Sequence, residues 1–244
     1  MDYKKLRILG LFIILVLPVL FFLIFQPLRK VPRPRLPKKL FALGTQERIN
    51  EKGLKVTDSV YHTIPNLKLA THLGDSIELD DLRGTIYVAD FFFATCPGIC
   101  PKMSSSLSKV QSTFVKDDNF KIISFTVDPE KDTMDALRLY ADRYDAIPGK
   151  WYFMRSSKSN IFQLARDGFF LTAKEDDGTG EEAFIHSEKL VLVDQEGIIR
   201  GYYSGIDSTS VNRMMGDIVL LLRAAEKGFS FRDQKKTSKK LFEK

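Results

Sequence analysis

An apolar run rich in β-prone residues, Thr85–Phe93, leads directly into the only two cysteines of the chain. A run of this kind predicts a central strand that is buried on both faces. The next segment, Lys102–Val115, carries apolar residues at helical spacing and predicts an amphipathic helix. Cys96 and Cys100 therefore stand where a buried strand gives way to a helix, and the fold has to be built around this strand–turn–helix unit.

Strands and helices alternate along the rest of the chain. We predict strands at Val60–Ile64, Ser76–Leu79, Phe120–Val127 and Trp151–Met154, helices from Thr133 to near Pro148 and over Ser159–Asp167, a β-hairpin at Leu190–Val193 and Ile198–Tyr203, and a last helix over Ser210–Ala225. Alternation of this kind gives parallel strands, and the hairpin adds an antiparallel pair. The predicted fold class is α/β, a three-layer fold with a mixed sheet that resembles the thioredoxin fold.

The N-terminal segment has a different character. From Ile8 to Leu28 it contains no charged residue in 21 positions. At 1.5 Å per residue such a helix spans about 30 Å, the thickness of a hydrocarbon core. The run does not end in a small-x-small cleavage site, so we predict one uncleaved transmembrane helix. A buried soluble helix is the alternative, and it is disfavoured because no polar face interrupts the run.

Four segments follow from these patterns. Residues 1–30 form the predicted membrane anchor, and residues 31–54 form a basic linker with three prolines between Pro32 and Pro37. Residues 55–226 form the predicted thioredoxin-like domain, and residues 227–244 a basic tail that we expect to be disordered.

The net charge of +6 belongs to the two ends of the chain. Residues 40–226 carry 21 basic and 28 acidic side chains, a net charge of −7. We therefore predict no nucleic-acid partner, because nucleic-acid-binding domains present clustered positive charge. Basic residues beside a membrane helix instead suit anionic lipid headgroups.

Cys96 and Cys100 are four residues apart at the predicted start of a helix. There, free backbone amides and the helix dipole favour a thiolate, and the i, i+4 spacing places both sulfurs on one face. Two thiolates suit a soft ion such as Cu(I), or they form a redox dithiol. A structural disulfide or a pair of buried thiols is the alternative, although so short a loop adds little stability.

A third metal ligand has to come from the three histidines of the chain. His62 and His72 lie in polar surroundings near the N-terminus and are predicted to be surface residues. His186 stands just before the first strand of the predicted hairpin and follows a glycine- and acid-rich loop, Lys174–Glu182. In a thioredoxin-like topology that loop comes near the cysteine turn, so His186 is the predicted third ligand.

Three motifs together resemble the SCO/SenC family of membrane-anchored, thioredoxin-like copper-binding proteins. They are Thr-Cys-Pro-Gly-Ile-Cys-Pro at 95–101, Val-Asp-Pro-Glu-Lys-Asp-Thr at 127–133, and His-Ser at 186–187 followed by Leu-Val-Leu-Val-Asp at 190–194. The resemblance covers about residues 55–225. It implies a copper ion, Cu(I) or Cu(II), held by Cys96, Cys100 and His186 outside the cytoplasm. It also implies cytochrome c oxidase subunit II, with its dinuclear copper site, as the partner.

Two positions depart from the family pattern. Many members carry an acid between the cysteines, where this chain has Gly98, and another before the histidine, where it has Ile185. Both departures remove negative charge near the metal, which affects its affinity and redox poise. In the motif at 127–133, Asp132 or Thr133 is predicted to cap the next helix, and Asp128 to lie beside the metal ligands.

Two functions stay open at this point. The first is a copper chaperone that delivers copper to subunit II. The second is a membrane-anchored thiol–disulfide oxidoreductase in which Cys96 and Cys100 form the catalytic dithiol and His186 is a general base or merely a neighbour. Peroxidase activity is the weaker third, because no peroxide-polarising set of residues is visible.

The dithiol also bears on location. Charges in the flanking segments alone place the large domain inside the cell. A dithiol that cycles between disulfide and metal thiolate suits the outer face of a membrane, where reductants are scarce. We therefore predict a single-pass protein of the bacterial inner membrane with its domain on the periplasmic side.

Overall fold

The computed structural model describes residues 3–25, 35–49, 53–171 and 187–226. The chain divides into two compact units, residues 1–35 and residues 36–244. The first contains helix α1 (Tyr3–Phe25), with Pro18 inside it. Among the described residues, no helix combines the length and the apolarity needed to cross a membrane. The predicted transmembrane helix over Ile8–Leu28 is therefore not confirmed.

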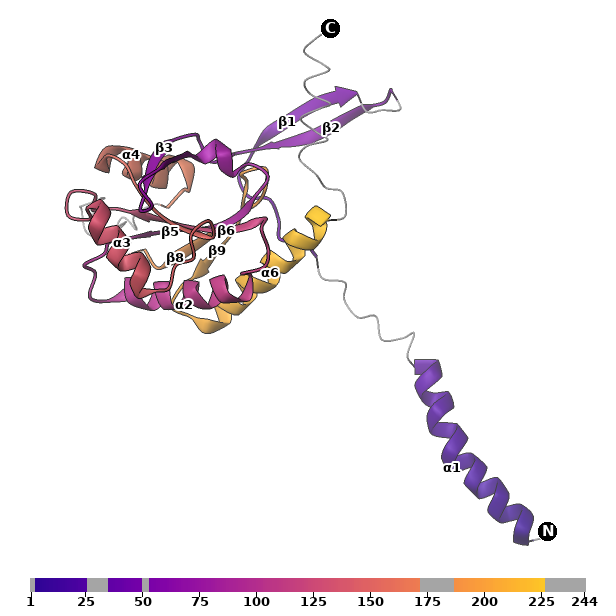
Figure 1. The fold of residues 1–244 in the computed structure, drawn as a ribbon. Coiled ribbons are helices and arrows are strands. Elements are labelled where there is room, and N and C mark those ends of the chain that lie inside the picture. The colour runs from indigo at the N-terminus through magenta and orange to yellow at the C-terminus, as the bar shows by residue number, and fades with distance from the viewer. Residues whose placement is uncertain (1–2, 26–34, 50–52, 172–186, 227–244) are drawn as a thin grey trace, which may run out of the picture. The chain divides into compact units, whose positions relative to one another are not determined.

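A seven-stranded mixed sheet forms the centre of the second unit (Figure 1). Its strands lie in the order β4 (Ser76–Glu78), β3 (Lys68–Thr71), β7 (Trp151–Arg155), β6 (Phe120–Thr126), β5 (Ile86–Phe92), β8 (Lys189–Val193) and β9 (Ile199–Ser204). Strands β5, β6 and β7 are parallel, and the other neighbours are antiparallel. Every residue of β5 is buried, as expected for a central strand with both faces covered.

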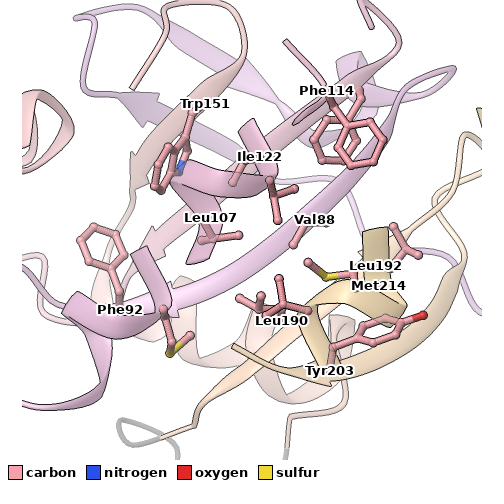
Figure 2. Close-up of a cluster of buried hydrophobic side chains, with 14 of the residues drawn as sticks. Val88, Phe92, Leu107, Phe114, Ile122, Trp151, Leu190, Leu192, Tyr203 and Met214 are labelled. Atoms are coloured by element: carbon pink, nitrogen blue, oxygen red, sulfur yellow. The ribbon is translucent and has the colours of Figure 1, made fainter. Parts of the chain in front are cut away.

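Helices cover both faces of this sheet. Helices α2 (Ile99–Thr113), α3 (Met134–Arg143) and α6 (Ser208–Glu226) pack on one face. Figure 2 shows the side chains that meet there, among them Val88, Leu107, Trp151 and Met214. The other face is covered by η1 (Leu79–Leu82), α4 (Lys158–Gln163) and the π-helical turn η2 (Leu164–Gly168). The predicted three-layer α/β fold is confirmed.

A two-stranded hairpin was not predicted from the sequence. Strands β1 (Ala42–Ile49) and β2 (Lys55–Tyr61) pair antiparallel and form a sheet of their own (Figure 1). Strand β1 lies inside the segment predicted as a linker, residues 31–54. Its sequence, Ala-Leu-Gly-Thr-Gln-Glu-Arg-Ile, lacks the β-branched and aromatic alternation by which strands are recognised.

The segment before β1 is fastened to the domain. The guanidinium of Arg200 lies 2.7 Å from the carboxylate of Asp194, both largely buried, and also donates to the Pro37 carbonyl. The amide of Leu40 donates to the carbonyl of Ile199 at 3.0 Å. These contacts explain why the second unit begins at Leu36, upstream of the boundary predicted at residue 55.

The prediction that His72 is a surface residue is wrong. Its exposed fraction is 4%, and its Nδ1 accepts the backbone N–H of Phe153 at 3.2 Å. Burial lowers the pKa of His72, because a charged ring is disfavoured away from water. His62 is half-buried, with Nε2 at 2.9 Å from the Gly168 carbonyl oxygen.

An acidic side chain lies inside the core, on the central strand. Asp90, in the middle of β5, is 1% exposed and accepts a hydrogen bond of 2.5 Å from the hydroxyl of Ser124. The indole N–H of Trp151 donates to the same hydroxyl oxygen at 2.9 Å. Burial raises the pKa of Asp90 to about 7, so the core favours its neutral form.

We expect Asp90 to make stability depend on pH. Its folded-state pKa, about 7, lies above that of an unfolded aspartate, so its contribution is complete below about pH 4 and is lost as the pH rises through 7. The loss is at most about 4 kcal/mol, because one pKa unit corresponds to about 1.4 kcal/mol. Asp90→Asn keeps an acceptor for the Ser124 hydroxyl and does not ionise. Its free energy of unfolding should therefore increase relative to that of the wild type as the pH rises.

Urea unfolding of the two proteins between pH 4 and pH 8 provides the measurement. His72 lowers the stability of the fold at acid pH, because burial lowers its pKa. This effect is present in both proteins, so it cancels in the difference between their free energies of unfolding. A difference in unfolding free energy that stays constant over this range would show that Asp90 does not titrate in the core.

Candidate metal centre

The two cysteines lie at one edge of the sheet. Strands β5 and β6 run in parallel and end together, with Phe92 opposite Thr126. The chain then turns through residues 93–98 and enters α2 at Ile99. Because α2 begins three residues earlier than the predicted Lys102, Cys100 lies in its first turn. The strand-to-helix placement of the dithiol is therefore present in the structure.

Backbone hydrogen bonds fix this turn. The amide of Cys96 donates to the carbonyl of Phe93 at 3.2 Å. The amide of Ala94 donates to Oδ2 of Asp132 at 3.0 Å, although Asp132 belongs to the loop after β6. The turn is thus held both by its own backbone and by a neighbouring loop.

The two thiols differ in exposure. Both are free, with Cys96 8% exposed and Cys100 1% exposed. Both cysteines belong to the buried cluster beneath α2, whereas Pro97 and Gly98, between them, are exposed. Cys96, next to the exposed Pro97, is therefore the less covered of the two thiols.

The pKa of the Cys96 thiol is lowered. Burial acts in the opposite direction, but it is outweighed by hydrogen bonds from the amides of Cys100, Gly98 and Ile99 and from the Cys100 thiol. These amides are the unpaired donors of the first turn of α2, which stabilise negative charge. Cys96 is consequently the thiol that becomes a thiolate.

The pKa of the Cys100 thiol is raised to about 12. Burial is the main cause, and the neighbouring Cys96 and the Asp90 carboxylate add to it. Cys100 therefore keeps its proton in the free protein. A bound cation would displace that proton, because metal ligation requires the thiolate.

The predicted third ligand, His186, lies outside the described residues, as does the loop Lys174–Glu182 before it. Within the ranges that the structure describes, no cluster of three or more His, Cys, Asp or Glu side chains could hold a metal ion. Two thiols form a soft donor set that fits copper(I), which also accepts low coordination numbers.

The loop after β6 carries the second predicted motif. Thr133 caps α3, with its hydroxyl oxygen accepting the amide of Ala136 at 3.2 Å. Asp128 is half-buried and its carboxylate lies 3.1 Å from Lys131 Nζ. Asp132 is not the cap, since its carboxylate points to the cysteine turn. Sequence reasoning missed this contact and the buried Asp90, although an acid within an apolar strand was a visible signal.

The fold and the site define a thioredoxin-like protein with an asymmetric dithiol at the carboxyl end of its central strands. The SCO1/SenC family model matches residues 56–222. The protein belongs to the SCO1/SenC family.

Known relatives agree with this assignment. The SCO1 protein homolog of Bacillus subtilis (strain 168) is 28% identical over 168 residues, which are 68% of this chain and 86% of the relative. The solved structure of BsSco, a member of the Sco family of cytochrome c oxidase assembly proteins in which a disulfide switch was identified, is 27% identical with a TM-score of 0.58. It covers 68% of this chain and 96% of its own.

A more distant structure shares the fold. Copper-bound ScoI from Bradyrhizobium japonicum is 19% identical, has a TM-score of 0.50, and covers 65% of this chain and 99% of its own.

The different pKa values of the two thiols predict different reactivities. In the reduced protein at pH 7, a short pulse of iodoacetamide should modify Cys96 at least about tenfold faster than Cys100, because only the thiolate reacts and its fraction changes about tenfold per pKa unit. Mass spectrometry with fragmentation between the two residues locates the label. Equal labelling, or earlier labelling of Cys100, would contradict the assignment.

Proposed function

We propose that the protein binds one copper ion through Cys96, Cys100 and His186 and delivers it to a copper site in another protein. The observation that carries this proposal is the pair of sulfurs at one edge of the sheet. The pKa of the Cys96 thiol is lowered, and the Cys100 thiol is buried with a raised pKa. Soft thiolates select Cu(I) over harder ions.

The described residues next to His186 support its role. Strand β8 runs antiparallel to β5, with Val191 opposite Ala89, so β8 begins at the edge where β5 ends. The carbonyl of Glu188, just before β8, accepts the amide of Gly205 at 2.8 Å. A Cβ added at Gly205 would meet the Met103 side chain at 2.9 Å, and Met103 follows Cys100 in α2. Glu188, two residues after His186 in the sequence, therefore lies at the same edge of the sheet as the two cysteines.

Family membership supports copper as the ligand, and copper was bound in the solved ScoI structure that shares this fold. The proposed recipient is the dinuclear copper site of cytochrome c oxidase subunit II, in keeping with the role of the Sco family in oxidase assembly that is stated for BsSco. Transfer would proceed by ligand exchange. The more exposed thiol, Cys96, is the one that a recipient's ligands reach first.

A second function, thiol–disulfide exchange, is favoured by one observation. A lowered pKa at Cys96 beside a raised pKa at Cys100 is the asymmetry that divides a dithiol into an attacking and a resolving sulfur. A disulfide switch has been identified in the related BsSco. In this role the thiolate of Cys96 attacks a partner disulfide, and Cys100 then displaces the partner thiol and closes the disulfide, so the partner is reduced.

Copper binding separates these functions. We expect the reduced wild-type protein to retain one Cu(I) per chain, and Cys96→Ser or Cys100→Ser to abolish retention, because one thiolate and one imidazole do not make a soft site. His186→Ala should weaken binding at least about tenfold, measured by competition with a chromogenic Cu(I) chelator. His62→Gln, a histidine outside the proposed site, is the matched control.

The opposite pattern favours the second function. If His186→Ala holds copper as tightly as the wild type but reduces a model disulfide more slowly, copper delivery fails and dithiol exchange stands.

We propose that the domain works on the periplasmic face of the bacterial inner membrane. The uncharged run at residues 8–28 and the basic residues on both sides of it support attachment to a membrane. A C-terminal alkaline phosphatase fusion should be active, because that enzyme needs an oxidising compartment, and the full chain should stay in the membrane pellet after alkaline carbonate washing. An inactive fusion, or release of the chain by carbonate, contradicts this location.

A further inference from the structure

Asp132 is a fully buried carboxylate in the loop between β6 and α3, with an exposed fraction of 0%. Its Oδ2 accepts two hydrogen bonds, from the Ala94 amide at 3.0 Å and from the Thr126 hydroxyl at 2.5 Å. Its Oδ1 is buried without a hydrogen-bond partner among the residues that the structure describes. An unpaired, buried carboxylate oxygen is costly, and helix capping does not explain it, because Thr133 supplies the cap.

The peptide unit that Asp132 holds is the one that orients Cys96. In the peptide between Phe93 and Ala94, the N–H belongs to Ala94 and donates to Asp132. The carbonyl belongs to Phe93 and accepts the Cys96 amide at 3.2 Å. Since a peptide unit is planar, fixing its N–H also fixes the direction of its carbonyl. Asp132 therefore controls a bond that positions Cys96.

The loop that carries Asp132 is itself firmly placed. The amide of Val127 continues the ladder of the sheet by donating to Phe92 at 2.9 Å. The amide of Asp132 donates to the Asp128 carbonyl at 2.9 Å, and the Arg155 guanidinium donates to the Pro129 carbonyl at 2.7 Å. These hydrogen bonds hold the loop in place where the Asp132 side chain contacts the cysteine turn.

We propose that Asp132 is a positioning residue for the dithiol: through the Ala94 amide it keeps the cysteine turn in the conformation that places the Cys96 sulfur against the amides of α2. Helix α2 begins at Ile99, and the free amides of its first turn stabilise negative charge on a sulfur placed against them, so a loosened turn would stabilise the reduced form less. Loss of the contact should then make the disulfide harder to reduce, and it should weaken copper binding because the two sulfurs are no longer held in place beforehand.

This inference rests on the proposed function only for its copper readout. The dithiol–disulfide equilibrium does not involve copper, so it tests the positioning role even if the wild type binds no copper. Absence of copper binding by the wild type would overturn the proposed function and leave the positioning role to the redox measurement.

The experiment compares three substitutions in the full chain. Asp132→Ala removes both hydrogen bonds. Asp132→Asn is the conservative rescue, because its carbonyl can take the place of Oδ2 and accept both. Thr133→Ala is the matched control, since it removes a contact of the same loop that does not reach the cysteine turn.

We expect Asp132→Ala to shift the equilibrium with a thiol–disulfide redox buffer at least tenfold toward the disulfide, about 30 mV for a two-electron couple. Its Cu(I) affinity should fall at least tenfold. Asp132→Asn should stay within threefold of the wild type in both measurements. Thr133→Ala should lower the melting temperature by about 2–4 °C, the effect of losing one helix cap in a domain of this size, and leave both equilibria unchanged.

A purely structural role gives a different pattern. If Asp132→Ala loses thermal stability but keeps both equilibria within threefold of the wild type, as Thr133→Ala does, the proposal is wrong. Should Asp132→Ala fail to fold, Asp132→Ser keeps a polar group in the loop that is too short to reach Ala94, and the same criteria apply. Should neither variant fold, hydrogen exchange of the wild-type Ala94 amide decides, because exchange at the rate of an unprotected amide excludes the hydrogen bond.

Discussion

Burial of strand β5 on both faces is the constraint on which the rest of the structure depends. A strand with all seven residues buried needs helices above and below it and hydrogen-bonded strands on either side, and the chain supplies all of these. At its carboxyl end, after Phe92, the chain leaves the strand. The turn that follows, with Cys96 and then α2, is placed at that end by the same packing. The position of the dithiol therefore follows from the packing of the core around β5.

The asymmetry of the dithiol follows from this geometry. The first turn of α2 presents its free amides to Cys96, while the same turn carries Cys100 into the core above Asp90. One sulfur becomes anionic and is slightly exposed, and the other stays protonated and is almost fully covered. A cation that binds both sulfurs has to remove the second proton, so binding of a metal and release of a proton are coupled. The two proposed functions, copper binding and disulfide exchange, would both use the sulfur atoms of Cys96 and Cys100.

The central strands and the cysteine turn could be predicted from the sequence because their signals are local. An apolar run such as Thr85–Phe93 predicts a buried strand even when its neighbours in the fold are unknown. The features that were missed depend on contacts between distant residues. His72 is buried because its ring accepts an amide 81 residues away, at Phe153, and Asp132 reaches Ala94 across 38 residues. Strand β1 was missed because its polar sequence has no strand-like alternation.

We propose that both sulfurs and the imidazole of His186 bind one copper ion. X-ray absorption spectroscopy of the copper-loaded protein tests it directly, because the scattering identifies the donor atoms. We predict two sulfur neighbours and one imidazole nitrogen for each copper, with the imidazole signal lost in His186→Ala. A spectrum with fewer than two sulfur neighbours, or one that is unchanged by the substitution, would contradict this three-ligand copper site.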